Sequence, residues 1–171
     1  MGELLGHGAG IYLKNSNNNE VSYSEIHDGP RYGVAQIAWP NLPKNDIYVY
    51  NNTVKYLKLY DTNQDSGDTG SLMNFGISDD SPYLVNYFEQ ITIDHIYAHP
   101  SLQDQAPNGI FMDNDSRGQN FKNIEVTNTQ GAQFRNNDSG YHTFDNVSWE
   151  GGFDSGLMDY DNIGTKSDFP Y

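Results

Sequence analysis

Residues 20–37 read EVSYSEIHDGPRYGVAQI and contain the two short patterns on which the fold prediction rests. In the first pattern, at 20–23, a polar residue is followed by Ile or Val, then any residue, then an apolar or aromatic residue. In the second pattern, at 33–37, a Gly precedes a mostly apolar run. Short segments rich in β-branched and aromatic side chains are typical of β-strands.

Both patterns recur along the chain, which indicates a repeat architecture. The first pattern occurs at 20–23, 46–49, 90–93, 123–126 and 146–149. The second pattern occurs at 10–13, 33–37, 70–73, 109–112 and 131–134. The markers of the first pattern are 26, 44, 33 and 23 positions apart, which we assign to one coil, two coils, a coil with an insertion and one coil. The sequence therefore predicts a parallel β-solenoid, with a single domain over 1–171 and an irregular C-terminal tail over 151–171.

Stacking explains how such a chain would fold. One short coil cannot bury its own apolar face, but stacked coils place Ile over Ile about 4.8 Å apart, so that the core becomes a continuous column. Asn side chains of successive coils are expected to hydrogen-bond along the same axis. An antiparallel sandwich stays open as the alternative, although it gives no reason for one template to recur near 23 residues.

The composition favours turns over helices and excludes several classes of partner. The 171 residues include 20 Asn and 17 Gly, which tolerate the backbone conformations of tight turns. The formal net charge of -14 would repel phosphate groups, so neither nucleic acid nor a membrane is expected as a partner. The absence of Cys removes disulfides and thiolate metal sites.

Residues 18–34 and 65–72 resemble the right-handed parallel β-helix proteins of the pectate-lyase-like superfold, which include polysaccharide lyases and glycoside hydrolases. The resemblance runs from about Gly10 to Trp149 and implies an all-β, right-handed helix of roughly six to seven coils. It further implies a secreted or periplasmic protein that acts on a polysaccharide or oligosaccharide. The chain departs from the family in having no room for an N-terminal cap, which leaves three interpretations: a fragment, self-association through open coil ends, or a small cap formed by residues 1–5.

An acidic cluster around the Gly70 pattern is the first candidate site. Asp65 and Asp68 precede this pattern and are candidate catalytic residues, while Asp79 and Asp80 follow it and are expected to contact substrate. Glycoside hydrolysis needs one protonated and one ionised carboxyl, and the coil phase predicts Asp113 as the partner carboxylate. Two alternatives remain, that these Asp residues only form turns and that Asp65 and Asp68 bind calcium. No other cofactor is expected.

A second set of candidates lies just before the Gly33 pattern. A lyase needs a base for the proton next to the uronate carboxyl and a cation to neutralise that carboxyl, roles that His27 and Arg31 would fill. Simple surface pairing of Arg31 with a nearby Asp is the alternative.

Four further residues are candidates for contact with substrate. Trp39 and Tyr32 offer aromatic rings against which sugar C–H groups stack. Asp115 and Arg117 directly follow the Gly109 pattern, where a strand leads into a loop.

These observations predict a carbohydrate-active β-helix protein that hydrolyses a glycosidic bond with paired Asp carboxylates. Lyase chemistry by Arg and His is the first alternative. A non-catalytic glycan-binding or structural module is the second.

Overall fold

The computed structural model describes residues 8–38, 49–76, 85–102, 106–114, 116, 118–137, 139–140 and 142–149, together with the backbone of residues 158–161. Within these ranges the chain forms strands and no helix, so no helix there could span a membrane. Sheet A contains, in spatial order, β1 (Ala9–Lys14), β3 (Tyr32–Ile37), β5 (Gly70–Phe75), β7 (Asn108–Asp113), β9 (Phe134–Asn137) and β11 (Met158–Asp161). Sheet B contains β2 (Glu20–His27), β4 (Thr53–Tyr60), β6 (Asn86–Asp94), β8 (Gln119–Val126) and β10 (Thr143–Trp149).

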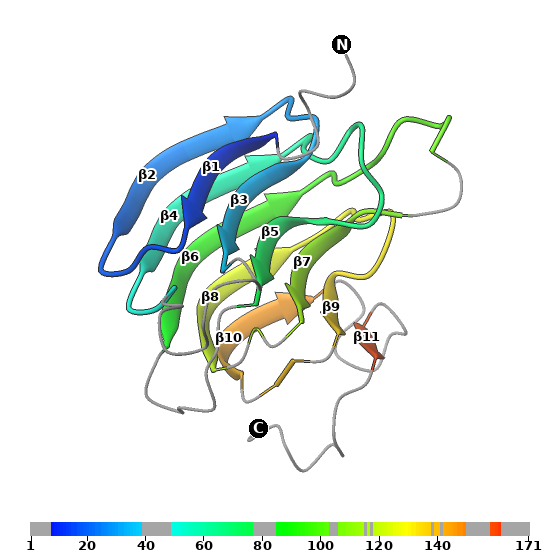
Figure 1. Ribbon diagram of the computed structural model, residues 1–171. Coiled ribbons are helices and arrows are strands. Elements are labelled where there is room, and N and C mark those ends of the chain that lie inside the picture. The colour runs from blue at the N-terminus through cyan, green and yellow to red at the C-terminus, as the bar shows by residue number, and fades with distance from the viewer. Residues whose placement is uncertain are drawn as a thin grey trace.

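The chain alternates between the two sheets, so that each odd-numbered strand joins sheet A and each even-numbered strand joins sheet B. Neighbouring strands in both sheets are parallel throughout, which excludes the antiparallel sandwich. Figure 1 shows the sheets one behind the other, and within each sheet the strands lie side by side in the order of the sequence. The predicted all-β fold with parallel strands is confirmed, and the arrangement is compatible with a parallel β-solenoid.

Most copies of the two sequence patterns lie in strands, and the structure contradicts one of them. The copy at 131–134 is displaced, because β9 begins only at Phe134. Of the copy at 46–49, only Val49 lies within the described residues, and it is not in a strand. The strand that pairs with β2 is β4, and its first residues, Thr-Val-Lys-Tyr at 53–56, have the same pattern.

The strand register corrects the spacing as well. Val21 pairs with Val54, and Val54 pairs with Phe88. The chain therefore advances by 33 and then 34 positions between neighbouring strands of sheet B at this level, where the sequence interpretation had steps of 26 and 44.

Apolar columns between the two sheets form the core. The column Val54, Phe88, Phe121 and Phe144 follows the register of sheet B, and the rings of Phe88 and Phe121 stack with centroids 5.1 Å apart. Sheet A contributes Leu72 and its register partners to the same core cluster. This is the stacked core that the repeat predicts, because each layer buries the apolar face that it could not bury alone.

A buried polar ladder accompanies the apolar columns. The backbone N–H of Asn19 donates to Oδ1 of Asn52, and the N–H of Asn52 donates to Oδ1 of Asn86, both at 3.0 Å. Further along the axis, the N–H of Gln119 donates to Nδ1 of His142 at 3.2 Å. We call Asn52, Asn86, Gln119 and His142 the polar ladder, and all four are fully buried.

Each strand of sheet B contains one residue with positive φ, and these residues lie level with one another. They are Tyr23, Tyr56, Gln90, Asn123 and Asn146, with φ between 52° and 56°. In β6 both Glu89 and Gln90 point outward, whereas Phe88 and Ile91 on either side are buried. The extra outward residue shifts the in-and-out alternation by one position, as a β-bulge does, and we call these five residues the bulge column.

Glycine is required where the two sheets approach closely. A Cβ added at Gly109, which begins the second pattern in β7, would lie 2.5 Å from Cγ1 of Val126 in sheet B and 2.8 Å from the backbone oxygen of Gln133. Only a residue without a side chain fits there.

One strand was not anticipated in the C-terminal segment. Residues 158–161, within the predicted irregular tail, form β11, and Met158 pairs with Phe134 of β9. The remainder of 151–171 lies outside the described residues.

Candidate functional site

The outer face of sheet A brings together charged and aromatic side chains from distant parts of the chain. In β7, Ile110 and Met112 point into the core, so Phe111 and Asp113 point to the opposite face. Phe111 pairs with Arg135 and Asp113 with Asn137 across the β7–β9 register. We call this region, together with Asp68 in the loop before β5, the sheet A site.

Two arginines of this face lie over aromatic rings. The guanidinium carbon of Arg135 is 4.9 Å from the ring centroid of Phe111, and that of Arg31 is 4.6 Å from the ring centroid of Tyr32. Both rings are almost completely buried, with exposed fractions of 2% and 3%. Such cation–π contacts fix the orientation of the guanidinium groups.

Arg135 also connects the face to Asp68. Its Nη1 lies 3.7 Å from Oδ1 of Asp68, whose side chain is largely exposed. The two residues are far apart in sequence, and they meet because Asp68 approaches the face from its loop while Arg135 belongs to β9.

Asp113 has a different environment. Burial, the largest effect, raises the pKa of its carboxyl, and the negative charge of Asp68 raises that pKa further. A hydrogen bond of 2.7 Å from Nδ2 of Asn137 and the charge of Arg135 act in the opposite direction without cancelling the rise. The face therefore holds one half-buried carboxyl that resists ionisation and one exposed carboxyl beside a guanidinium.

This arrangement is able to move protons. A carboxyl with a raised pKa retains a proton that it can donate, and an ionised carboxylate can accept one or attack as a nucleophile. The pKa of the nearby Tyr32 hydroxyl is also raised, chiefly by burial, so the phenol keeps its proton and remains a hydrogen-bond donor.

The structure brings Asp68, Asp113, Arg31 and Tyr32 to sheet A and leaves other predicted residues elsewhere. Asp65 is exposed, and its backbone N–H donates to the carbonyl of Pro30. Within the described part of the chain, no group of three or more His, Asp or Glu residues could hold a metal ion. Calcium binding by Asp65 and Asp68 stays a prediction.

His27 and Arg31, the predicted lyase pair, have different surroundings. His27 ends β2 in sheet B, where its Nδ1 lies 2.7 Å from Oδ2 of Asp28 and its ring stacks on Tyr60 with centroids 4.9 Å apart. Arg31 lies over the ring of Tyr32, the first residue of β3 in sheet A. The two side chains thus sit on different sheets, each with its own partners.

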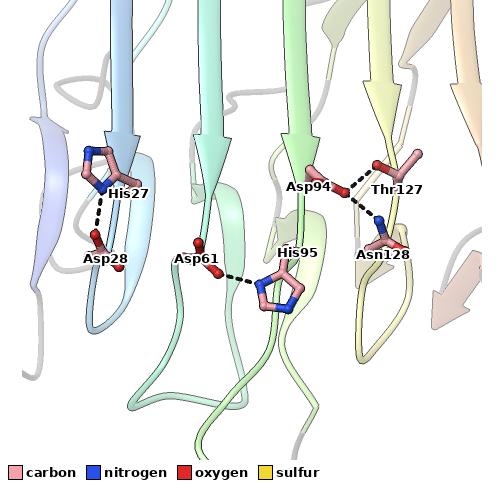
Figure 2. A network of polar contacts seen from close by, with 7 residues as sticks. All are labelled: His27, Asp28, Asp61, Asp94, His95, Thr127 and Asn128. Carbon is pink, nitrogen blue, oxygen red and sulfur yellow. Dashed lines mark hydrogen bonds and ion pairs between the residues drawn. The ribbon is translucent and has the colours of Figure 1, made fainter.

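His27 belongs to a row of polar side chains at the ends of the sheet B strands (Figure 2). Along this row Asp61 pairs with His95 of the next level. Further along, Asp94 accepts hydrogen bonds of 2.7 Å from Thr127 and from Asn128. These bonds link successive levels, with Thr127 the largest of the influences that lower the pKa of Asp94.

Five predicted substrate contacts, namely Trp39, Asp79, Asp80, Asp115 and Arg117, lie outside the described residues. Conversely, the sequence interpretation did not include Arg135 and Asn137 in the site. The spacing could have indicated Arg135, because it lies 24 positions after Phe111, which is about one coil of this repeat.

The fold and the site define an all-β protein of two parallel, alternating sheets with a charged and aromatic outer face. Comparison with protein-family models, with curated proteins and with solved structures finds no match.

Proposed function

We propose that the chain is a right-handed parallel β-helix of six to seven coils, of the pectate-lyase-like kind, that is exported and hydrolyses a glycosidic bond in a polysaccharide. Asp113 is the general acid that protonates the leaving oxygen. Asp68 is the base or nucleophile. The regular alternation of parallel strands between two sheets supports the fold part of this proposal.

The observation that carries the proposed activity is the contrast between the two carboxyls. Burial raises the pKa of Asp113, whereas Arg135 lies within ion-pair distance of Asp68. Retaining and inverting glycoside hydrolases both need one carboxyl that acts as an acid and a second that acts as a base or nucleophile. A carboxyl that burial keeps protonated, close to a second carboxyl that lies beside a guanidinium, is a pair that can serve as acid and base.

A neutral sugar is the substrate class that fits the charge of the site and of the chain. The formal net charge of -14 disfavours an acidic uronate polymer. The Asn137 amide adds a neutral hydrogen-bonding group beside the two carboxyls, and hydroxyl groups of a sugar can both donate to and accept from such groups.

The test compares Asp113→Asn and Asp68→Asn with the native protein on a panel of polysaccharides. We expect either substitution to lower the release of reducing ends by about 100-fold or more, since general acid–base catalysis contributes on that scale. Asp145→Asn is the matched control, because Asp145 is an exposed carboxyl on sheet B. Circular dichroism should be the same for all variants.

Three outcomes would contradict the proposal. The first is native turnover in Asp113→Asn. The second is absorbance from unsaturated ends in place of simple reducing ends, which would indicate a lyase. The third is the absence of both products with every polysaccharide, which would support the non-catalytic module.

A further inference from the structure

The outer face of sheet B is hollowed over β6, β8 and β10, on a surface that the proposed hydrolysis does not use. Two adjoining hollows of about 470 and 510 Å³ lie there, both shallow and widely open to solvent. Thr92, Glu125 and Ser148 line both of them, so the hollows form one continuous depression, which we call the sheet B trough.

The sizes of the side chains explain why the trough is hollow. Its floor follows the register Thr92, Glu125 and Ser148, in which two of the three side chains are short. At the same register position in the preceding strand, β4 has the long and exposed Lys58. The depression therefore begins at β6, where Thr92 stands at the register position that Lys58 has in β4.

Each wall of the trough carries neutral hydrogen-bonding groups. The bulge column contributes Gln90, Asn123 and Asn146, and Nδ2 of Asn146 donates to Oδ1 of Asn123 at 2.7 Å. The opposite wall is the row at the strand ends, where Thr127 and Asn128 bind Asp94 (Figure 2).

Two aromatic rings continue the bulge column at the β2–β4 end of the sheet. Tyr23 and Tyr56 stack with their ring centroids 4.7 Å apart and their planes 7° apart. Their exposed fractions are 78% and 41%, so ring surface remains in contact with solvent. An exposed stacked pair of this kind buries little apolar surface, and it offers a flat face to a ligand.

The charges of the described trough residues limit the ligand. Glu125 and Asp94 line the trough and are acidic, whereas the exposed Lys58 of β4 lies only at its edge and Lys122 of β8 lies 3.6 Å from Asp145. Anionic polymers would be repelled. Amides, hydroxyls and carboxylates together satisfy the donors and acceptors of sugar hydroxyls, and aromatic rings take their C–H faces.

We propose that the sheet B trough is a second, non-catalytic binding site for a neutral polysaccharide chain, which lies across the strands with the Tyr23–Tyr56 pair as its aromatic platform. The trough itself spans β6, β8 and β10, about 10 Å at a strand spacing of about 4.8 Å, and the Tyr23–Tyr56 pair extends the path along the bulge column, beside Lys58, to roughly 20 Å. The identity of the polymer rests on the proposed function. The trough would hold the polymer while the sheet A site acts on it.

Two variants disrupt the proposed site and keep the backbone conformation, one by filling the floor of the trough and one by removing the aromatic platform. Thr92→Lys places in β6 the residue that β4 already has at the same register position. The double variant Tyr23→Asn/Tyr56→Asn removes the aromatic platform, and Asn tolerates positive φ, as Asn123 and Asn146 do in the same column. Thr143→Lys adds the same charge at an exposed position of β10 outside the trough and is the matched control.

The experiment is affinity electrophoresis in gels that contain neutral glucans, xylans or mannans, together with turnover of the polymer and of short oligosaccharides. We expect both trough variants to be retarded at least five-fold less than Thr143→Lys. Their KM for the polymer should rise, with an unchanged kcat on short oligosaccharides. Asp113→Asn should be retarded like the native protein.

Equal retardation of the trough variants and Thr143→Lys would overturn the inference, as would the absence of retardation in every neutral polymer. The two proposals fail in distinguishable ways. Loss of turnover in Asp113→Asn together with normal binding by the trough variants removes the trough alone. Normal turnover in Asp113→Asn together with weakened binding by the trough variants removes the assigned hydrolysis alone.

Discussion

His142 makes the stability of this fold depend on pH, and the structure gives the direction and the size of the effect. The imidazole is fully buried at the end of the polar ladder, and its Nδ1 accepts the backbone N–H of Gln119. Since Nδ1 accepts, the ring proton resides on Nε2, which donates to Oδ1 of Asn136 at 2.8 Å. Protonation of Nδ1 would turn this acceptor into a donor facing another donor.

Burial lowers the pKa of His142 from its ordinary 6.5 to about 3. As the pH falls below 6.5, the unfolded chain binds a proton that the folded chain does not, so stability declines until the pH reaches the folded pKa. Each unit of difference is worth about 1.4 kcal/mol, so a fall to pH 4 removes about 3 kcal/mol. That is a large part of the roughly 5–15 kcal/mol that keeps a typical domain folded.

The assay is urea unfolding at pH 7 and at pH 4 for the native protein and for His142→Gln. Gln keeps an acceptor at the same place in the ladder but does not titrate, and Gln119 already serves as an acceptor for Asn86 Nδ2 at 3.1 Å. Trp149 reports on the region, because it packs at 5.8 Å from Phe134, which is itself 5.9 Å from His142.

The comparison of the two pH dependences isolates the histidine, since the carboxylates contribute equally to both proteins. We expect the native protein to lose about 3 kcal/mol more than His142→Gln between pH 7 and pH 4. Equal losses in the two proteins would refute the assignment of His142 as a neutral buried acceptor.

Two further substitutions test the core. Gly109→Ala should lower the free energy of unfolding by about 1–3 kcal/mol, because the added Cβ would lie 2.5 Å from Cγ1 of Val126, and an unchanged urea midpoint would contradict this close contact. Phe121→Ala should cost about 3–5 kcal/mol, since the ring is fully buried and stacks on Phe88, and a loss below 1 kcal/mol would argue against the stacked column.

The parts of the fold that could be predicted from the sequence are those that depend on local patterns. Strands β2 and β7, which begin at Glu20 and Asn108, show their character within a few residues, because alternation and β-branching are local properties. Coil length is not local. Loops of unequal length separate the strands, so the step from Val54 to Phe88 was misread even though the pattern at 53–56 was present.

The candidate site was predictable to a smaller extent, for a related reason. Asp68 and Asp113 could be proposed together, because both flank copies of the same pattern. Arg135 lies one coil of 24 positions after Phe111, but that spacing alone does not fix which side chains pair, because the β7–β9 register depends on the start of β9 at Phe134. An error of a few positions in a strand boundary moves a side chain to another place on the sheet, or to its opposite face.

The bulge column has a consequence for how this fold would acquire binding surfaces. Every strand of sheet B has a bulge at the same level, so one repeated backbone feature lines up outward side chains along the whole sheet. Its side chains differ from strand to strand, with Tyr at one end and Asn at the other. Because the backbone at these positions depends on its neighbours above and below and the side chains point outward, substitutions there should alter ligand contacts at a smaller cost in stability than substitutions in the core columns. Asn tolerates positive φ more readily than Tyr, so replacing Tyr56 by Asn should leave stability unchanged or higher while weakening retention by a neutral polysaccharide. That combination would separate a column maintained for binding from one maintained for folding.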